Sequence, residues 1–413
     1  MVEKEYGLAI DLGTTTLALA LVDLQQGSVL AEEGDLNPQT DFGPDVLSRI
    51  TYVGRNGREG RRALQKAAVR GINEALFRLL GRTGLLPQQV TKGAIAGNTT
   101  MIHLLLGEDP EGLGFAPFEP AFTGARKVLS GDLGLALAED AELYCLPCAS
   151  AYLGGDAVAG AWTMGLHKTM DTKLLVDIGT NGELLLVKDG QLYGCSCAAG
   201  PALEGNGLSC GMRAGKGAVE DAQLLPDGSW HLQTIGGRAP VGLCGSGALA
   251  ATAALLASGR LAPDGLLQEE TVLLHKGAGY DITITQRDIR QLQLAKGALL
   301  SGTIALLQAA EISAEDVEEA AVAGNFGSHL SRSLLVQTGI LPAGLQDAIS
   351  FRGNTALQGA CAALLSAEAR SEMERLARHI KVVELANLPG YDSLFLEALA
   401  FPNPNCNQSG GIF

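Results

Sequence analysis

An acidic, glycine-containing turn that occurs twice constrains the fold most strongly. The first copy reads Asp-Leu-Gly-Thr-Thr-Thr over residues 11–16, and the second reads Asp-Ile-Gly-Thr-Asn-Gly over residues 177–182. Each copy stands between two short apolar runs, a pattern that is typical of a strand, a tight turn and a second strand. We therefore expect two copies of one hairpin in the fold.

A second pair of repeats follows the turns in the same order. An apolar stretch stopped by Gly-Asn occurs at 94–98 and again at 321–325. It begins 83 residues after Asp11 in the first half but 144 residues after Asp177 in the second half, so the second half should carry an insertion. Internal repeats of this kind predict two homologous α/β lobes, with the functional site between them.

The domain division follows from these repeats. We expect an N-terminal lobe over residues 1–168, a C-terminal lobe over 169–401 and an irregular Pro/Asn/Gly-rich tail over 402–413. Apolar residues at helical spacing predict helices within three stretches, 60–80, 288–311 and 367–379.

Charge and composition exclude several classes of function. The 413 residues include 30 Lys and Arg against 45 Asp and Glu, and a net charge of −15 argues against nucleic acid or an anionic membrane as the main partner. The N-terminus has no charged-then-apolar leader, which makes the cytoplasm the expected location. Residues 239–259 carry no charge, but they are rich in small residues and contain Pro240, so we expect a buried strand–turn–helix there rather than a membrane span.

The residues of the two turns suit a phosphate and a hard cation. Gly13 permits close backbone approach, so N–H groups and the hydroxyls of Thr14, Thr15 and Thr16 can face a phosphate, while the Asp11 carboxylate reaches Mg²⁺ through water. The second turn offers the same groups, namely those of Asp177, Gly179, Thr180, Asn181 and Gly182. A lone turn of this kind is more often only a hairpin closed by an Asx hydrogen bond, but a matched pair favours a polyphosphate site.

These motifs resemble the superfamily of acetate kinase, sugar kinases, heat-shock ATPases and actin. The resemblance implies two actin-like, ribonuclease H-like lobes whose Asp-x-Gly-Thr turns are the phosphate loops, with a late Gly-Gly turn that cradles adenosine. Here that turn reads Ala-Gly-Asn-Phe-Gly over 323–327, with Asn325 in place of the second glycine. The resemblance also makes Asp156 the residue that orients the attacking water, although Asp156 could instead be the N-cap of a helix.

Within the superfamily, the chain is similar to the ATP-dependent reductive activators of corrinoid proteins, from about residue 6 to residue 401. The similarity rests on six motifs: Gly97–Met101 with His103, Ala198–Gly205, Cys210–Arg213, Cys244–Gly247, Ala323–Gly327 and Gly353-Asn354. It implies an ATPase that reactivates a corrinoid methyltransferase system by supporting reduction of cob(II) to cob(I).

The resemblance also assigns the site. Asp11, Asp156 and Asp177 would be catalytic, and Asp11 and Asp177 would hold Mg²⁺, through water. ATP would bind, beyond the residues of the two turns, at Asn98, Thr99, Glu183, Glu204, Gly245, Ser246, Gly324, Asn325 and Phe326.

The cysteines mark a departure from this family. Its members usually carry a [2Fe–2S] domain at the N-terminus or a cysteine cluster at the C-terminus, and neither pattern is seen here. We therefore expect no iron–sulfur cluster in this chain, and a separate ferredoxin-like protein as the electron donor. Six cysteines that could still converge on a metal are better interpreted as buried thiols: Cys145, Cys148, Cys195, Cys197, Cys210 and Cys244.

Other residues keep two interpretations. Glu204 and Arg213 could orient water and clamp phosphate or form a structural salt bridge, and Lys296 could reach phosphate or snorkel to solvent. His103 is more easily explained as a core histidine than as a catalytic one. A homodimer also stays open.

Two other functions remain open at this level. A small-molecule kinase of the same fold would use Asp156 or Asp11 as base, and a chaperone-like module would use ATP only to time binding. In each case, ATP·Mg²⁺ is expected to draw the two lobes together.

Overall fold

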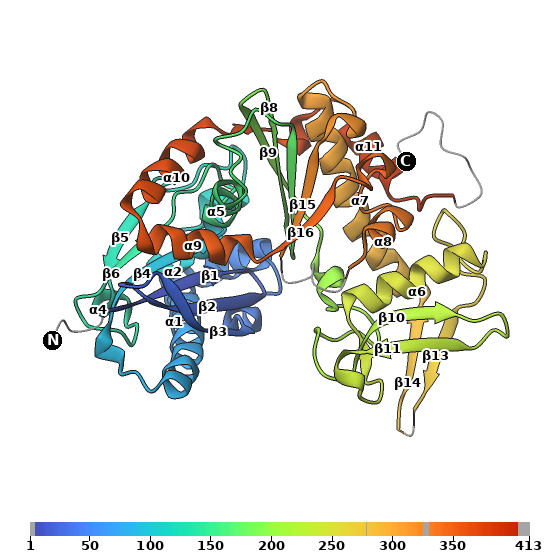
Figure 1. The fold of residues 1–413 in the computed structure, drawn as a ribbon, viewed down its shortest axis with the longest axis horizontal. Coiled ribbons are helices and arrows are strands. Elements are labelled where there is room, and N and C mark those ends of the chain that lie inside the picture. The colour runs from blue at the N-terminus through green and yellow to red at the C-terminus, as the bar shows by residue number, and fades with distance from the viewer. Residues whose placement is uncertain (1–4, 278, 325–329, 404–413) are drawn as a thin grey trace. The chain divides into compact units, whose positions relative to one another are not determined.

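The computed structural model describes residues 5–277, 279–324 and 330–403, and the chain forms two compact units (Figure 1). Unit 1 runs to Thr169 and also includes Gly190–Leu192 and Asn354–Val382, and the remainder is unit 2. The change of unit after Thr169 lies one residue from the expected boundary at 168/169. The return of residues 354–382 to unit 1 differs from the sequence interpretation, which kept the chain in the second domain to residue 401.

The sheet of unit 1 has six strands in the order β3-β2-β1-β4-β6-β5. Its strands are β1 Tyr6–Leu12, β2 Thr16–Asp23, β3 Ser28–Leu36, β4 Val90–Gly97, β5 Arg126–Leu129 and β6 Glu142–Cys145. Strands β1 and β2 are antiparallel and β4 runs parallel to β1, which confirms the hairpin and the first apolar strand that ends at Gly-Asn.

Seven helices pack around this sheet in the described part of unit 1. They are α1 Val46–Thr83, α2 Thr99–Leu106, α3 Glu111–Gly114, α4 Ser130–Leu133, α5 Gly155–Thr163, α9 Thr355–Leu365 and α10 Ala367–His379. Helix α10 has the predicted bounds. Helix α1 begins well before the predicted 60–80, because Asp45 and Ser48 form a capping box and the helix continues across a kink at Gly57.

The two faces of β1 pack against different helices. Side chains alternate between faces along a strand, so the large residues Leu8, Ile10 and Leu12 join a core with α1. The small residues Gly7 and Ala9 face the other way, and a Cβ at Gly7 would lie 2.7 Å from Leu364 of α9. Because this face carries little side-chain volume, α9 lies close to the strand.

The second sheet has the order β16-β15-β7-β8-β9-β17. Its strands are β7 Lys173–Ile178, β8 Gly182–Lys188, β9 Gln191–Cys197, β15 Glu319–Ala323, β16 Ile349–Gly353 and β17 Lys381–Val382. The described helices of unit 2 are α6 Gly245–Ala257, α7 Gln286–Ala309, α8 Arg332–Gln337 and α11 Tyr391–Ala398. Helix α7 confirms the predicted helix over 288–311 to within two residues at each end.

The two sheets repeat one strand order and share the register between the first strand and the strand that ends before Gly-Asn. The order β3-β2-β1-β4-β6 of the first corresponds to β9-β8-β7-β15-β16 of the second. Asp11 is paired with Ala96, and Asp177 is paired with Ala323, in each case the residue just before the Gly-Asn pair. The duplication inferred from the sequence is therefore confirmed at the level of strand register.

The longer second half contains additional elements. Between β9 and β15 lie a three-stranded sheet and a two-stranded sheet, made by β10 Ala218–Leu224, β11 Trp230–Thr234, β12 Gly242–Leu243, β13 Thr271–Lys276 and β14 Asp281–Thr285. The uncharged stretch 239–259 contains β12 and α6. Among the described residues, no helix has the length and apolar character needed to cross a membrane.

The close packing of α9 on α5 can be tested with two glycines that both lie in helices. A Cβ at Gly359 of α9 would lie 2.5 Å from the Cβ of Ala159 in α5, whereas a Cβ at Gly81 of α1 would meet nothing within 4 Å. We expect Gly359→Ala to lower the unfolding free energy by about 1–3 kcal/mol through overpacking, and Gly81→Ala to raise it by about 0.5–1 kcal/mol through helix propensity. Urea unfolding of both variants tests this, and equal midpoints would contradict the packing.

Candidate functional site

The first phosphate loop lies between β1 and β2, and its carbonyl groups accept hydrogen bonds from Asn37 and Arg49. The side-chain amide of Asn37 donates to the Gly13 carbonyl (2.8 Å), and the Asn37 backbone N–H donates to the Thr15 carbonyl (2.9 Å). The guanidinium of Arg49 donates to the carbonyl between them, that of Thr14 (2.6 Å). Three successive carbonyls therefore point to the same buried partners.

This arrangement fixes where the loop's N–H groups point. In a trans peptide the N–H lies opposite the C=O, so the amides of Thr14 and Thr15 point away from Asn37 and Arg49. A side chain at Gly13 would also place a Cβ 2.8 Å from the Thr16 carbonyl. The loop thus has the form of an anion cradle, which explains its glycine.

Arg49 places a positive charge directly beneath the loop. The side chain is fully buried, and it also donates to the Gly43 carbonyl (3.0 Å) and the Gln39 side chain (3.2 Å). Burial lowers its pKa to about 10, and the nearby Asp45 raises it, so the guanidinium stays charged at neutral pH. Neither Asn37 nor Arg49 was identified from the sequence, where nothing distinguishes them from ordinary loop and helix residues.

Asp11 is the last residue but one of β1 and lies on the strand face that packs against α9. Asn354, the N-cap of α9, accepts from the N–H of Leu357 and donates its side-chain amide to the Asp11 carboxylate (2.7 Å). Burial raises the pKa of Asp11 to about 6, although this hydrogen bond lowers it. In the sequence Gly353-Asn354 is recognisable only as a motif, because the contact of Asn354 with Asp11 requires the return of the chain to unit 1.

Asp156 lies in the first turn of α5, where its carboxylate accepts from the N–H of Ala157 (2.8 Å). The N-cap is Gly154, so the alternative interpretation of Asp156 as N-cap is wrong. Burial raises the pKa of Asp156 to about 7, the Ala157 bond lowers it, and the charge of Asp11 raises it. The two carboxyl groups therefore interact within unit 1.

Asn98 contacts both the first phosphate loop and the start of α5. It caps α2 by accepting from the N–H of Met101 (2.9 Å) and donates to the Thr14 hydroxyl (2.8 Å). A Cβ at Gly154 would lie only 2.3 Å from the Asn98 Cα. Asn98 thus joins loop 1 to the start of α5, while the neighbouring Thr99 donates its hydroxyl to the Ser150 carbonyl (2.6 Å).

The second phosphate loop, in unit 2, has its own supports. The Gly179 N–H donates to the Asn181 carbonyl (3.1 Å), and the Gly200 N–H donates to the Thr180 carbonyl (2.8 Å). The Thr180 hydroxyl donates to the carboxylate of Glu204 (2.6 Å). Glu204 therefore contacts the predicted loop directly.

Gly324 lies against the same loop. It has φ +96°, and a Cβ there would meet the Ile178 carbonyl at 2.5 Å and the Asp177 carboxylate at 2.9 Å. Only glycine fits this conformation and this distance. Asn325 and Phe326, the rest of the predicted adenosine motif, lie outside the described residues.

The remaining predicted residues of unit 2 lie at two places. Gly182 and Glu183 begin β8, and Asp177 is paired with Glu183 across the hairpin. Gly245 and Ser246 form the first turn of α6, a 13-residue helix whose start is so close to β10 that a Cβ at Gly247 would lie 2.1 Å from a backbone carbonyl.

The donor set of loop 1 fits Mg²⁺. Burial raises the pKa of the Asp11 carboxylate, and a hard divalent cation with oxygen ligands would offset this cost. In the described part of the chain no three His, Cys, Asp or Glu side chains are gathered as metal ligands. One or two carboxylates, with water and phosphate oxygens, is the set that Mg²⁺ commonly takes.

The cysteines with described positions are unpaired thiols, mostly buried. Burial raises the pKa of Cys145, Cys148 and Cys197 to about 12, and raises that of Cys195 strongly. Their surroundings favour the neutral thiol over a thiolate ligand. Cys244 is buried at the N-terminus of α6, and Cys210 is half-buried with its sulfur 3.5 Å from the Asp281 carbonyl.

Two further candidates belong to the core. His103 is fully buried, lies 2.7 Å from the Thr99 carbonyl through Nδ1 and stacks on Phe122 at 4.2 Å. Lys296 is fully buried in α7, donates to the Ala400 carbonyl and lies 5.4 Å from the ring of Phe401. Its side chain therefore does not snorkel to solvent.

Two sheets with one strand order, each with an Asp-x-Gly-Thr loop after its first strand, define the ASKHA class of nucleotide-binding proteins, to which sugar kinases and actin belong. Residues 6–169 match the RACo middle region, and residues 171–410 match the C-terminal domain of RACo, the ASKHA domain. The chain belongs to this family, the reductive activators of corrinoid proteins.

Comparison with individual relatives is consistent with this family assignment. The chain is 32% identical to the corrinoid activation enzyme RamQ of Eubacterium limosum, over 95% of this chain and 70% of that protein. It is 24% identical to the [Co(II) methylated amine-specific corrinoid protein] reductase of Methanosarcina barkeri, over 96% of this chain and 77% of that protein. A solved structure of a reductive activator for corrinoid, iron-sulfur protein superposes with a TM-score of 0.91 at 35% identity, over 97% of this chain and 67% of that one.

The support beneath loop 1 yields a binding prediction. Arg49→Lys keeps the charge but removes the planar group that reaches the Thr14 and Gly43 carbonyls together, so the loop loses its fixed geometry. We expect the Kd for Mg·ATP to rise about tenfold, equivalent to about 1.4 kcal/mol, as measured by calorimetry. Arg78→Lys, at the exposed far end of the same helix, is the control, and an unchanged Kd for Arg49→Lys would contradict the role.

The raised pKa of Asp156 yields a pH prediction. Its pKa is about 7 when folded against 3.8 ordinarily, so the folded state holds the extra proton and the unfolding free energy falls as pH rises from about 4 to 7. Asp156→Asn should lessen this fall and stabilise the nucleotide-free protein at pH 8, while ATP turnover drops by about 10²- to 10⁴-fold.

Urea unfolding between pH 4 and 8 in the presence of a chelator measures the effect. The exposed Asp132→Asn of α4 is the matched control, and it should keep the wild-type pH dependence. A variant at position 156 with the wild-type pH dependence would refute the burial of this charge.

Proposed function

We propose that the protein is an ATP-dependent activator that supports the reduction of cob(II) to cob(I) in a corrinoid protein. ATP is hydrolysed by water to ADP and phosphate, and the corrinoid accepts one electron from a separate, ferredoxin-like donor. The reduced corrinoid then accepts a methyl group in a methyltransferase system.

The observation that carries the proposal is the arrangement around Asp11. An anion cradle, a carboxylate held by Asn354 and a second carboxylate with a pKa near neutrality occur together in unit 1. These are the parts that phosphoryl transfer to water requires: phosphate binding, a metal anchor and a proton acceptor. Membership of the corrinoid activator family adds the partner.

Each residue has a defined role in this proposal. The amides of Thr14 and Thr15 bind phosphate oxygens, and the charge of Arg49 strengthens the cradle from behind. Asp156 orients the attacking water and takes its proton, for which a pKa of about 7 is suited. Asp11 in the first loop and Asp177 in the second are the carboxylates that would anchor Mg²⁺ through water, and the ion would supply neutralisation of charge on the phosphates.

The role of hydrolysis is energetic. Reduction of cob(II) is unfavourable, and ATP can assist it only as far as the nucleotide states differ in their affinity for the corrinoid protein or for its cobalt coordination. The protein therefore acts on its partner's cofactor through binding.

The decisive experiment follows the cobalt spectrum. The protein is mixed with a purified corrinoid protein in the cob(II) state and Ti(III) as reductant, with and without Mg·ATP, while ADP release is measured. We expect cob(I) to form only with ATP. ATP consumption that depends strictly on a metabolite would instead show a kinase, and ATP hydrolysis without cob(I) formation would show a nucleotide-timed binding module.

The second loop gives a further prediction for this assay. Asp177→Asn removes a metal-anchoring charge, and we expect ATP turnover and cob(I) formation to fall by at least about 100-fold. Asp189→Asn is the control, because Asp189 is exposed in the β8–β9 turn with φ 50°, which asparagine tolerates. Wild-type turnover in Asp177→Asn would refute the site.

A further inference from the structure

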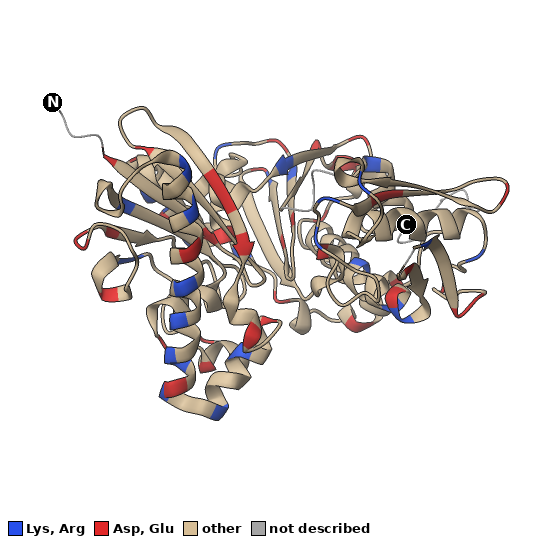
Figure 2. Cartoon of the chain, turned by 90° about the horizontal axis from the view of Figure 1, so that it is seen from below, with Lys and Arg blue, Asp and Glu red and all other residues tan. Residues whose placement is uncertain are grey.

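Helix α1 has a charge opposite to that of the rest of the protein. It carries nine Lys and Arg residues against two Glu, whereas the remaining chain has 21 basic and 43 acidic residues. Figure 2 shows basic residues along this helix. A net charge of +7 on one helix of an acidic protein requires an explanation.

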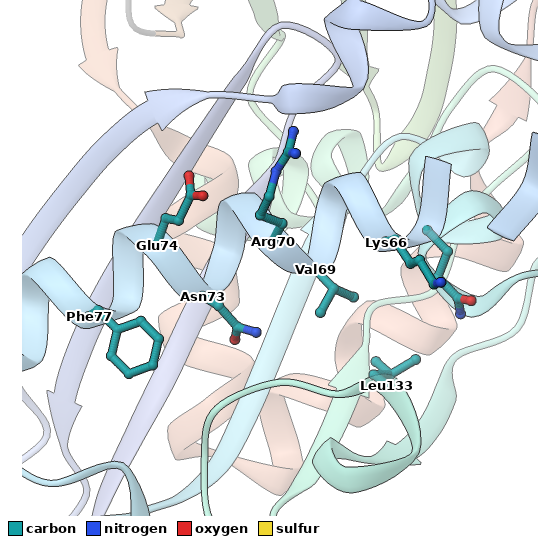
Figure 3. A pocket seen from close by; sticks show the side chains of 8 residues that line it. Lys66, Val69, Arg70, Asn73, Glu74, Phe77 and Leu133 are labelled. Carbon is teal, nitrogen blue, oxygen red and sulfur yellow. The ribbon is translucent and has the colours of Figure 1, made fainter. Parts of the chain in front are cut away.

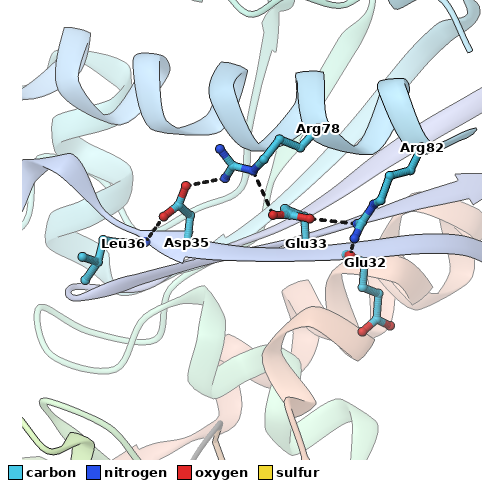
Figure 4. A network of polar contacts seen from close by, with 6 residues as sticks. All are labelled: Glu32, Glu33, Asp35, Leu36, Arg78 and Arg82. Atoms are coloured by element: carbon cyan, nitrogen blue, oxygen red, sulfur yellow. Dashed lines mark hydrogen bonds and ion pairs between the residues drawn. The ribbon is translucent and has the colours of Figure 1, made fainter. Parts of the chain in front are cut away.

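The C-terminal end of α1 is neutralised by β3. Arg78 forms ion pairs with Glu33 (2.9 Å) and with Asp35, and Arg82 pairs with Glu33 (2.8 Å), as Figure 4 shows. These arginines hold the helix against the edge strand of the sheet. The charges of Arg78 and Arg82 are therefore neutralised by carboxylates of unit 1 itself.

The middle of the helix is different. Arg58, Arg62, Lys66 and Arg70, here called the α1 basic row, are four residues apart and so lie next to one another along the helix. All four are exposed. Within the described ranges Arg58, Arg62 and Lys66 have no ion pair, and Arg70 reaches only the exposed Asp41 at 4.0 Å. The row spans about 18 Å at 1.5 Å per residue.

A partly apolar groove continues from the row. It has a volume of about 550 Å³ and runs along α1 past Val69 and Asn73 to Phe77, with Leu133 on the opposite wall (Figure 3). Asn73 fixes that wall, since it donates to the Gly134 carbonyl (3.0 Å) and accepts from the Ala136 N–H (2.8 Å). The Phe77 side chain is 55% exposed at the end of the groove.

We propose that the α1 basic row and the Phe77 groove form the docking surface for an acidic face of the corrinoid protein. The inference rests on the proposed function, which requires that partner. A row of cations beside an exposed aromatic side chain is the combination of polar rim and apolar anchor found in protein interfaces.

The charge distribution favours a protein over a nucleic acid. The acidic remainder of the chain repels a long polyanion, and Glu59 and Glu74 interrupt the basic face of α1 itself. A folded protein can place a few carboxylates against the row without meeting the rest of the acidic surface. Its attraction should be strong at low salt and weaken as the Debye length falls.

A charge-reversal pair tests the surface. Arg58→Glu/Arg62→Glu is compared with Arg375→Glu/Arg378→Glu, which makes the same charge change at two exposed arginines of α10 in the same unit. Binding of the purified cob(II) corrinoid protein is measured by surface plasmon resonance at 20 and 300 mM salt, together with ATP hydrolysis without partner and cob(I) formation.

We expect the α1 pair to weaken association at least about tenfold at low salt, with a smaller difference at high salt and unchanged basal ATP hydrolysis. The α10 pair should stay within about twofold of wild type. Phe77→Ser should weaken binding at both salt concentrations.

Wild-type binding by the α1 pair, or equal losses of binding in both pairs, would overturn the inference. A loss that appears only as a change of oligomeric state would also overturn it, because the surface would then belong to an interface with a second copy of the chain. Tight binding of a random-sequence RNA that the α1 pair abolishes would also count against it. If wild-type protein forms no cob(I), the proposed function fails instead.

Discussion

The hydrogen bond from Asn354 to Asp11 depends on how closely a helix can approach a strand. Gly7 and Ala9 leave one face of β1 almost without side chains, and Gly359 lets α9 pack equally closely on α5. Only at this separation does the N-cap of α9 reach the carboxylate. The small residues that would weaken an ordinary core therefore position the first carboxylate of the candidate site.

The same region contains charged groups whose burial is unfavourable. Two carboxyl groups, at Asp11 and Asp156, are held with raised pKa by burial, and a buried guanidinium at Arg49 is satisfied by carbonyl groups. A cation and a polyphosphate bound at loop 1 would compensate these charges. The burial of these groups therefore lowers the unfolding free energy of unit 1 without ligand, while it keeps the site preorganised for binding.

The sequence revealed what is local and repeated. Two hairpins, the two strands that precede the Gly-Asn pairs and the helix at 367–379 follow from short apolar periods and turn residues, and the structure reproduces them. Contacts between distant segments were not accessible in this way. Asn37 and Arg49 act on loop 1 only because the chain returns beneath it, and Asn354 acts on Asp11 across 343 residues of sequence.

Helix α1 joins two of these features. Arg49, before the kink at Gly57, lies under loop 1, and the α1 basic row begins directly after the kink. The two segments pack against each other across the kink, since a Cβ at Gly60 would lie 2.9 Å from the Asn56 Cβ and 3.3 Å from the Val53 Cα. A displacement of the row would therefore be passed to the segment that holds Arg49 beneath loop 1. The resulting coupling between partner and nucleotide cannot exceed the difference in partner affinity between nucleotide states.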